Sequence, residues 1–328
     1  MVVESTKENL TMFNRDMLLK LIIPVAIEQT LSVTVGMADM IMVSGAGEAA
    51  VSGISLVNSI SILLVMLFAA LASGGSVVVA QYLGSGNQDK ACRAAEQQVL
   101  SCLLISIGLT VFALVGNRAI LSLIYGSVEE EVMNNAVTYF AIIAISFPFL
   151  AMYNAGAALF RVMNNAHISM IMSAIMNVIN IMANAVFIFY LHMDIAGVAY
   201  ATLLSRMVAA IVLMLQIRRQ SLPVHIDRYF RFHWDSHMMK NILRIGVPQG
   251  LENSMFQIGK LLTQSLISSF GTAAIAANAC ASTVEMLADI PGSAMGIALV
   301  TIIGQCAGAG EYGQARQYAK KLLKITYA

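Results

Sequence analysis

Five acidic residues lie inside long apolar stretches of this sequence: Glu28, Asp39, Glu252, Glu285 and Asp289. An ionisable side chain at membrane depth usually serves binding or transport, because an unpaired charge is expensive to bury there. A carboxylate in such a place can act as a switch, since it attracts a cation when it is ionised and releases the cation when it is protonated. The acidic residues are therefore the first candidates for binding a cation or a cationic substrate.

Asp39 is the strongest of these candidates, and its alternative role is a carboxylate near the outer interface that bonds to backbone. Glu28 follows Pro24 by four residues, and Glu252 follows Pro248 by four. Proline frees a backbone carbonyl and permits a kink in a membrane helix. A glutamate beside it could gate or bind a cation, but the symmetry of the pair leaves a shared structural role open.

Two further groups could share a helix face. Glu285 and Asp289 are one helical turn apart, so they could attract a cation together, unless Lys260 neutralises them in a salt bridge. Asn177, Asn180 and Asn184 have spacings of 3 and 4, which places them on one face of a helix. Thr202 could join this polar face, and the alternative is that the asparagines only hold helices together through hydrogen bonds.

The composition indicates what kind of structure must position these residues. Hydrophobic residues make up 58% of the chain and charged residues 11%, whereas soluble domains carry about 25% charged residues. A membrane-spanning helix needs roughly 20 mostly apolar residues. The sequence predicts an all-α polytopic membrane bundle with spans at about 17–43, 51–83, 96–116, 132–158, 166–190, 195–217, 239–269 and 277–306.

The basic residues predict the orientation, because cytoplasmic loops hold an excess of Lys and Arg. With the N-terminus inside, the cytoplasmic segments collect sixteen of the 19 basic residues, Arg161 among them, and the outer segments hold only Arg118. We therefore expect a multi-pass protein of the inner (plasma) membrane with a cytoplasmic N-terminus. The net charge of +1 gives no reason to expect a nucleic-acid partner.

The sequence contains an internal repeat with an offset of 224 residues. The offset aligns Pro24 with Pro248, and it also aligns Gln81, Gly84 and Gly86 with Gln305, Gly308 and Gly310. One repeat holds an even number of spans, so both copies cross the membrane in the same direction. We expect a six-helix lobe at 1–217, a cytoplasmic linker at 218–238 and the first two spans of a second lobe at 239–328, as in a C-terminally truncated transporter.

Five segments carry a family resemblance: IPVAIEQTLSVTVGMADMIMVSGAGEAAVSG, VAQYLGSGNQDKA, IAGVAYATLLSR, GVPQGLENSMFQIGKLLTQSLISSFGTAAIAANA and IPGSAMGIALVTIIGQCAGAGEYGQA. Together they resemble the bacterial multidrug and toxic compound extrusion (MATE) transporters. The resemblance implies two lobes of six helices and export of organic cations in exchange for H⁺ or Na⁺ by alternating access. It places the coupling carboxylate at Asp39, with Asn180, Asn184 and Thr202 around it. Similar sequences often carry Asp where this one has Asn184.

Other features complete the expectation. The resemblance implies no cofactor beyond the coupling ion, a small organic cation as substrate, the lipid bilayer as surroundings and a monomeric carrier. One alternative keeps the fold but moves lipid-linked saccharides, which would require Arg or Lys along the cleft to hold a pyrophosphate. An intramembrane enzyme is a second alternative, but the sequence has no H-E-x-x-H, D-x-x-x-D pair or G-x-S-x-G motif.

Overall fold

The computed structural model describes residues 12–43, 48–126, 129–226, 234–268, 270 and 272–327. Over these residues the regular structure is helical and contains no β-strand, which confirms the predicted all-α bundle. The helices are α2 (Arg15–Val43), α3 (Glu48–Gly84), α4 (Gln88–Tyr125), α5 (Glu130–Ile145), α6 (Phe147–Val162), α7 (Ala166–Ala185), the π-helical turn η2 (Val186–Tyr190), α8 (Asp194–Ile217), α9 (Ser236–Ser268), α10 (Thr272–Gly308) and α11 (Tyr312–Thr326).

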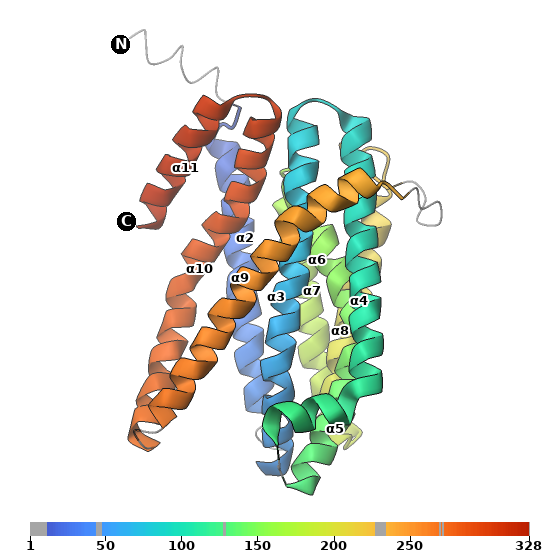
Figure 1. The fold of residues 1–328 in the computed structure, drawn as a ribbon, viewed down its shortest axis with the longest axis vertical. Helices are drawn as coiled ribbons and strands as arrows, with labels where there is room; N and C mark the ends of the chain where they lie inside the picture. The colour runs from blue at the N-terminus through green and yellow to red at the C-terminus, as the bar shows by residue number, and fades with distance from the viewer. Residues whose placement is uncertain are drawn as a thin grey trace.

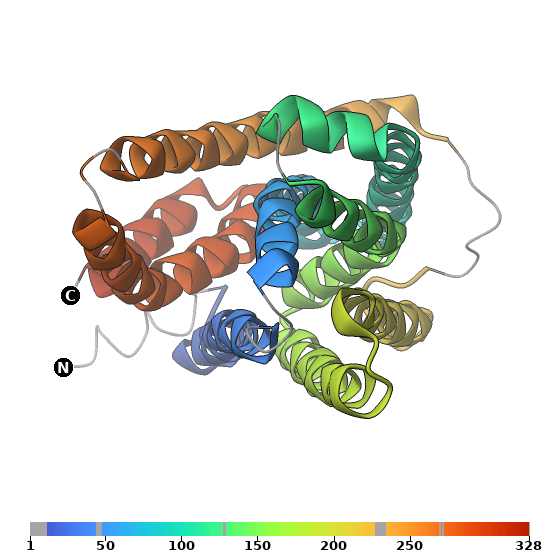
Figure 2. The ribbon, with the colours of Figure 1, turned by 90° about the horizontal axis from the view of Figure 1, so that it is seen from below.

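The long helices run side by side, and α3 lies among them at the centre (Figures 1 and 2). It packs against α4, α5, α6, α9 and α10, while α2 packs against α7 and α10. Figure 1 shows α9 crossing obliquely over α3. The central helix therefore touches both the first part of the chain and the part that follows the linker.

The helices place small side chains inward and large apolar ones outward. On α4, Ala91, Ala94 and Ala95 are fully buried, whereas Phe112 and Val115 are exposed. Small residues let membrane helices approach closely, and large apolar residues face lipid at no cost. This pattern fits a bundle whose outer surface meets hydrocarbon.

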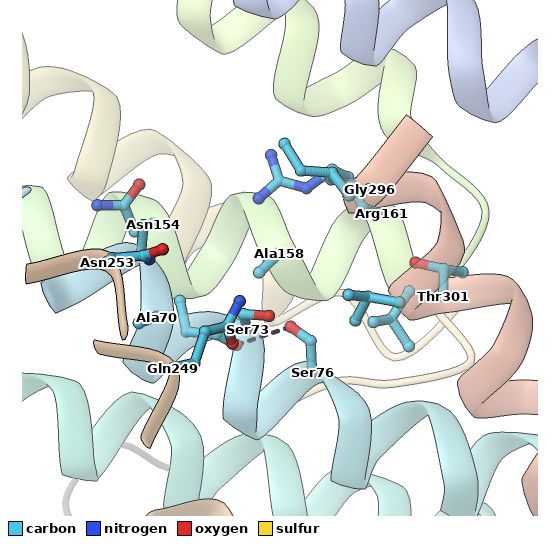
Figure 3. A pocket seen from close by; sticks show the side chains of 15 residues that line it. Ala70, Ser73, Ser76, Asn154, Ala158, Arg161, Gln249, Asn253, Gly296 and Thr301 are labelled. Atoms are coloured by element: carbon cyan, nitrogen blue, oxygen red, sulfur yellow. Dashed lines mark hydrogen bonds between the residues drawn. The ribbon is translucent and has the colours of Figure 1, made fainter. Parts of the chain in front are cut away.

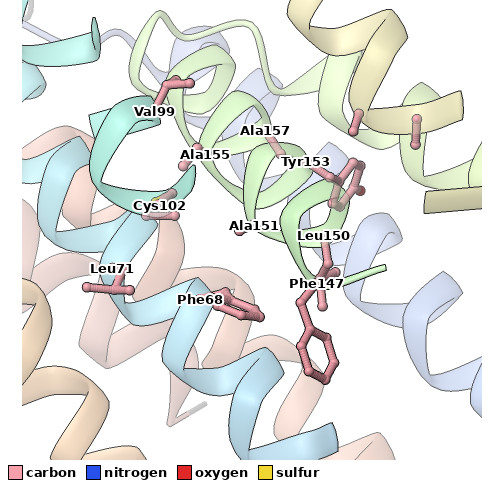
Figure 4. Close-up of a cluster of buried hydrophobic side chains, with 14 of the residues drawn as sticks. Phe68, Leu71, Val99, Cys102, Phe147, Leu150, Ala151, Tyr153, Ala155 and Ala157 are labelled. Carbon is pink, nitrogen blue, oxygen red and sulfur yellow. The ribbon is translucent and has the colours of Figure 1, made fainter. Parts of the chain in front are cut away.

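The main core lies between α3, α4, α6 and α8 (Figure 4). The rings of Phe68 and Phe147 pack with centroids 6.0 Å apart, beside alanines of α6. Gln98 is buried in the same core, and its Nε2 donates to the backbone oxygen of Ala72 at 2.9 Å. A buried polar group of this kind needs a partner, and here it ties α4 to α3.

The predicted fourth span is broken in the middle. The sequence analysis took 132–158 as one span, but α5 and α6 meet at Ser146 with a bend of 44°. Pro148 is the physical reason, because proline cannot donate the helical hydrogen bond and its ring clashes with the preceding turn. The Ser146 hydroxyl donates to the oxygen of Ile143 at 2.7 Å and accepts from Arg206 Nη1 at 2.7 Å, so α8 holds the break in place.

Six of the described helices are long and apolar enough to cross a membrane, and the bent α5–α6 pair would make a seventh span. The predicted span at 239–269 is helical, as α9, but α9 does not pass the same test of composition. It contains Lys240, Arg244, Glu252 and Lys260, which lower its mean hydropathy.

The helix bounds reproduce the repeat found in the sequence. α3 spans 48–84 and α10 spans 272–308, which is the same interval displaced by 224 residues. The turn that follows is also repeated: Gly86 has φ 73° and Gly310 has φ 79°. α11 starts at Tyr312, the counterpart of the first residue of α4. The sequence analysis assigned no helix there, although its own offset predicts one.

We expect Gly86→Ala and Gly310→Ala each to lower the free energy of unfolding by about 1–2 kcal/mol, because an L-residue with a side chain is strained at positive φ. Reversible SDS unfolding in mixed micelles measures the change. Gly313→Ala in α11 is the matched control, since an added Cβ there meets nothing within 4 Å. Equal effects at 310 and 313 would contradict the prediction.

Candidate functional site

The two repeats touch at a symmetric crossing of α3 and α10. An added Cβ at Gly84 would overlap the backbone oxygen of Gln305, and an added Cβ at Gly308 would overlap that of Gln81. Each glycine therefore faces the counterpart of the glutamine in its own motif. Gly304 faces Ala80, its own counterpart, with a hypothetical Cβ only 2.6 Å from Ala80 Cβ. Such reciprocal contacts are the mark of a two-fold arrangement, which here relates the repeats.

This crossing closes one end of the interface between the repeats. We call it the closed end: the end where α3 finishes at Gly84 and α10 finishes at Gly308. Gln305 is buried there, and its Nε2 donates to the backbone oxygen of Val162 at 2.6 Å. The crossing thus joins α10 both to α3 and to the end of α6.

A cavity of about 180 Å³ lies beside the closed end, where α3 and α6 of the first repeat meet α9 and α10 of the second (Figure 3). Alanines and glycine leave the space, and polar side chains border it. Those side chains are Ser73, Ser76, Asn154, Arg161, Gln249, Asn253 and Thr301. Asn154 Nδ2 is buried and has no hydrogen-bond partner among the described residues.

Glu28 is held by a buried ion pair at the edge of this cavity. Arg161 Nη1 lies 3.0 Å from Glu28 Oε1 and 3.2 Å from Oε2, and the Ser169 hydroxyl donates to Oε2 at 2.8 Å. The side chains are only 9% and 14% exposed for Glu28 and Arg161. The contact joins α2, α6 and α7. Glu28 is therefore not a free carboxylate, and Arg161, which the sequence analysis counted with a cytoplasmic loop, belongs to the site.

Its counterpart in the second repeat has different surroundings. Glu252 is exposed on α9, and no described residue pairs with it in the way that Arg161 pairs with Glu28. The structure thus separates two residues that the sequence made equivalent.

The asparagines of α7 form one buried face. Asn177, Asn180 and Asn184 are each no more than 7% exposed. Asn184 Nδ2 donates to Asn180 Oδ1 at 3.1 Å, and Asn180 Nδ2 lies 3.4 Å from Thr202 Oγ1 on α8. The structure therefore brings Asn180, Asn184 and Thr202 together in one polar network, and α2 packs against α7.

Asp39 was predicted to complete this network. The backbone of α2 passes through position 39, but the Asp39 side chain lies outside the part of the chain that the structure describes. Its contacts with the asparagines stay a prediction.

Glu285 and Asp289 make local contacts on α9 and α10. Lys260 Nζ lies 2.8 Å from Glu285 Oε1, which is the salt bridge considered as an alternative from the sequence. The Ser293 hydroxyl donates to Asp289 Oδ2 at 2.9 Å. Both acidic side chains are exposed, and neither lines the cavity at the junction of the repeats.

Sequence reasoning missed Arg161, Gln305 and Asn154 as site residues. For Gln305 a signal was available, because glutamine is rare at membrane depth and the repeat conserves it at position 81. Arg161 gave a misleading signal, since a basic residue at the end of a span is typical of a loop. Asn154 has no distinguishing pattern along the chain.

The fold matches solved MATE structures. A crystal structure described as MATE in the bent conformation has a TM-score of 0.86 with 22% identity, covering 94% of this chain and 69% of that one. A transporter from Pyrococcus furiosus, described as a MOP superfamily member whose binding pocket has reverse polarity, has a TM-score of 0.87 with 23% identity, covering 94% and 68%. These likenesses show the fold.

Relatives in sequence are described as drug-resistance proteins. The probable multidrug resistance protein NorM of Thermotoga maritima is 28% identical over 311 residues, covering 90% of this chain and 64% of the relative. The probable multidrug resistance protein YoeA of Bacillus subtilis is 24% identical, covering 86% and 62%. The chain thus spans less than two thirds of the length of these relatives.

The sequence model of the MatE family matches residues 24–186 and 248–328. The two matches begin at Pro24 and Pro248, the prolines that the offset of 224 residues aligns. Together they cover well over half of the chain, and their starting points agree with the two helical repeats. The chain therefore belongs to the MatE family, the multidrug and toxic compound extrusion transporters.

Proposed function

We propose that this protein works as a secondary active antiporter, exporting organic cations or drugs in exchange for H⁺ or Na⁺. The observation that carries the proposal is the polar cavity between the repeats, which is closed at one end by the crossing of α3 and α10. Alternating access requires a central site that opens to one side while the other is shut, and a parallel repeat can rock around such a site.

The polar network of α7 and α8 supports a coupling site in the first repeat. Asn180, Asn184 and Thr202 offer side-chain oxygens, which are suitable ligands for a hard cation such as Na⁺. Asp39 would add the negative charge that the network lacks, and its protonation would then compete with the metal ion. We propose Asp39 as the residue whose ionisation couples transport, with these three residues around it.

The distribution of basic residues supports a plasma-membrane location with the N-terminus and the closed end in the cytoplasm. We propose a monomeric carrier that needs no partner beyond the bilayer, the coupling ion and its substrate. Of the described residues that line the cavity, Arg161 alone is charged. A lipid-linked saccharide would need several cations for its pyrophosphate, so drug export is the better proposal.

The test is efflux of rhodamine 123, an organic cation, from proteoliposomes under an imposed pH or Na⁺ gradient. We expect gradient-driven efflux with the native chain and efflux at background level with Asp39→Asn, because the variant cannot alternate between a charged and a neutral form. Asp89→Asn, in the exposed first turn of α4, is the control and should transport normally.

Three outcomes separate the parts of this proposal. The gradient that drives efflux identifies the coupling ion. Unchanged efflux with Asp39→Asn would move the coupling to Glu252, Glu285 and Asp289. Absence of efflux under both gradients with the native chain would contradict drug export.

A further inference from the structure

Arg161 has hydrogen-bond donors to spare at the cavity. A guanidinium presents five N–H donors in a fixed fork, but among the described residues its contacts with Glu28 use Nη1 alone. Arg161 also lines the cavity, where Figure 3 shows it above Ala158 and facing the side chains of α3 and α9. The remaining nitrogens could therefore bind a ligand held in this space.

A second unused donor points to the same ligand chemistry. Asn154 Nδ2, which borders the cavity from the same helix, is buried and unpaired within the described part of the chain. A buried donor left without a partner costs free energy, and an acceptor group on a ligand would remove that cost. Gln249 and Asn253 of α9 border the cavity as well, so donors are available from both repeats.

The charge of the site limits what the acceptor group can be. Among the described lining residues Arg161 carries the one charge, and Glu28 at its edge balances that charge. A single negative group could take the place of the Glu28 carboxylate on the guanidinium, because Arg binds carboxylates through its planar fork. A diphosphate would bring more negative charge than one arginine can neutralise.

We propose that Arg161 and Asn154 form a subsite for a carboxylate on the transported molecule, and that Glu28 occupies Arg161 until this carboxylate competes for it. The inference rests on the proposed export function and narrows its substrates to organic cations that also carry a carboxylate. Drug-sized ligands usually fill pockets of about 300–1,000 Å³. The cavity of about 180 Å³ therefore takes one end of the molecule.

Two dyes that differ by one methyl group test the subsite. Rhodamine 110 carries a free carboxylate, and rhodamine 123 is its methyl ester. Binding of each to the purified chain in nanodiscs is measured at neutral pH by fluorescence anisotropy. We expect Arg161→Gln to weaken rhodamine 110 binding at least about ten-fold, the usual range for a lost charged hydrogen bond, and rhodamine 123 binding less than about two-fold.

Glu28→Gln should have the opposite effect, because it removes the competing carboxylate from Arg161. We expect it to strengthen rhodamine 110 binding by about three-fold or more and to leave rhodamine 123 unchanged. Glu252→Gln, at the equivalent position of the second repeat, should change neither. If Arg161→Gln fails to fold, the pair Glu28→Gln with Arg161→Gln leaves no unpaired charge and should show the same loss for rhodamine 110.

The subsite is wrong if Arg161→Gln weakens both dyes equally or weakens neither, and also if the native chain binds neither dye. Efflux of rhodamine 123 distinguishes this failure from that of the proposed function. A wrong subsite leaves efflux of the ester intact. A wrong export function abolishes efflux in proteoliposomes, while the difference in binding between the two dyes remains.

Discussion

Gly308→Ala is expected to force α3 and α10 apart and to expose the closed end of the molecule. The added Cβ would overlap the backbone oxygen of Gln81, and backbone cannot rotate away as a flexible side chain can. Overpacking of a well-packed interface costs about 1–3 kcal/mol. Gly84→Ala should have a similar effect through Gln305, and the double variant should cost less than the sum because both act on one crossing.

Cys306 is a natural reporter of this change, since it lies next to Gln305 and is fully buried. The measurement is the rate of maleimide labelling in a chain whose Cys92, Cys102 and Cys280 are replaced by alanine. We expect fast labelling in Gly84→Ala and Gly308→Ala and slow labelling in the parent. Gly108→Ala is the control, because an added Cβ there meets nothing within 4 Å. Slow labelling in all variants would show that the crossing tolerates a side chain.

Glu28→Ala should destabilise the protein by about 3–5 kcal/mol, because removing one partner leaves the other charge of a buried pair uncompensated. The stranded charge is Arg161, only 14% exposed, and the Ser169 hydroxyl loses an acceptor as well. SDS unfolding in mixed micelles measures the loss. Replacing Glu28 and Arg161 together by Gln should recover part of it, since no buried charge remains.

Glu252→Ala is the matched control for this prediction. It removes the same side chain from the equivalent position of the second repeat, where the glutamate is exposed. Exposed substitutions away from special features usually change stability by less than about 0.5 kcal/mol. Equal losses at 28 and 252 would mean that the ion pair with Arg161 contributes nothing particular to the fold.

Local features were readable from the sequence because they depend on nearby residues. The apolar stretches predicted helices whose bounds the structure places within a few residues for 17–43, 51–83 and 195–217. The spacing of Asn177, Asn180 and Asn184 predicted one face, and those side chains share a buried face. The break at Ser146 was missed even though Pro148 marks it, because hydropathy alone runs through a proline without interruption.

The sequence by itself determined the helical membrane architecture and the offset of 224 residues between repeats, since length, hydropathy and motif spacing are properties of neighbouring positions. Only the tertiary structure decided which polar groups meet. Glu28 and Arg161 are 133 residues apart in the chain, and Gly84 meets Gln305 across two repeats. Such contacts follow from how whole helices pack, so identical motifs gave Glu28 a buried partner and left Glu252 exposed.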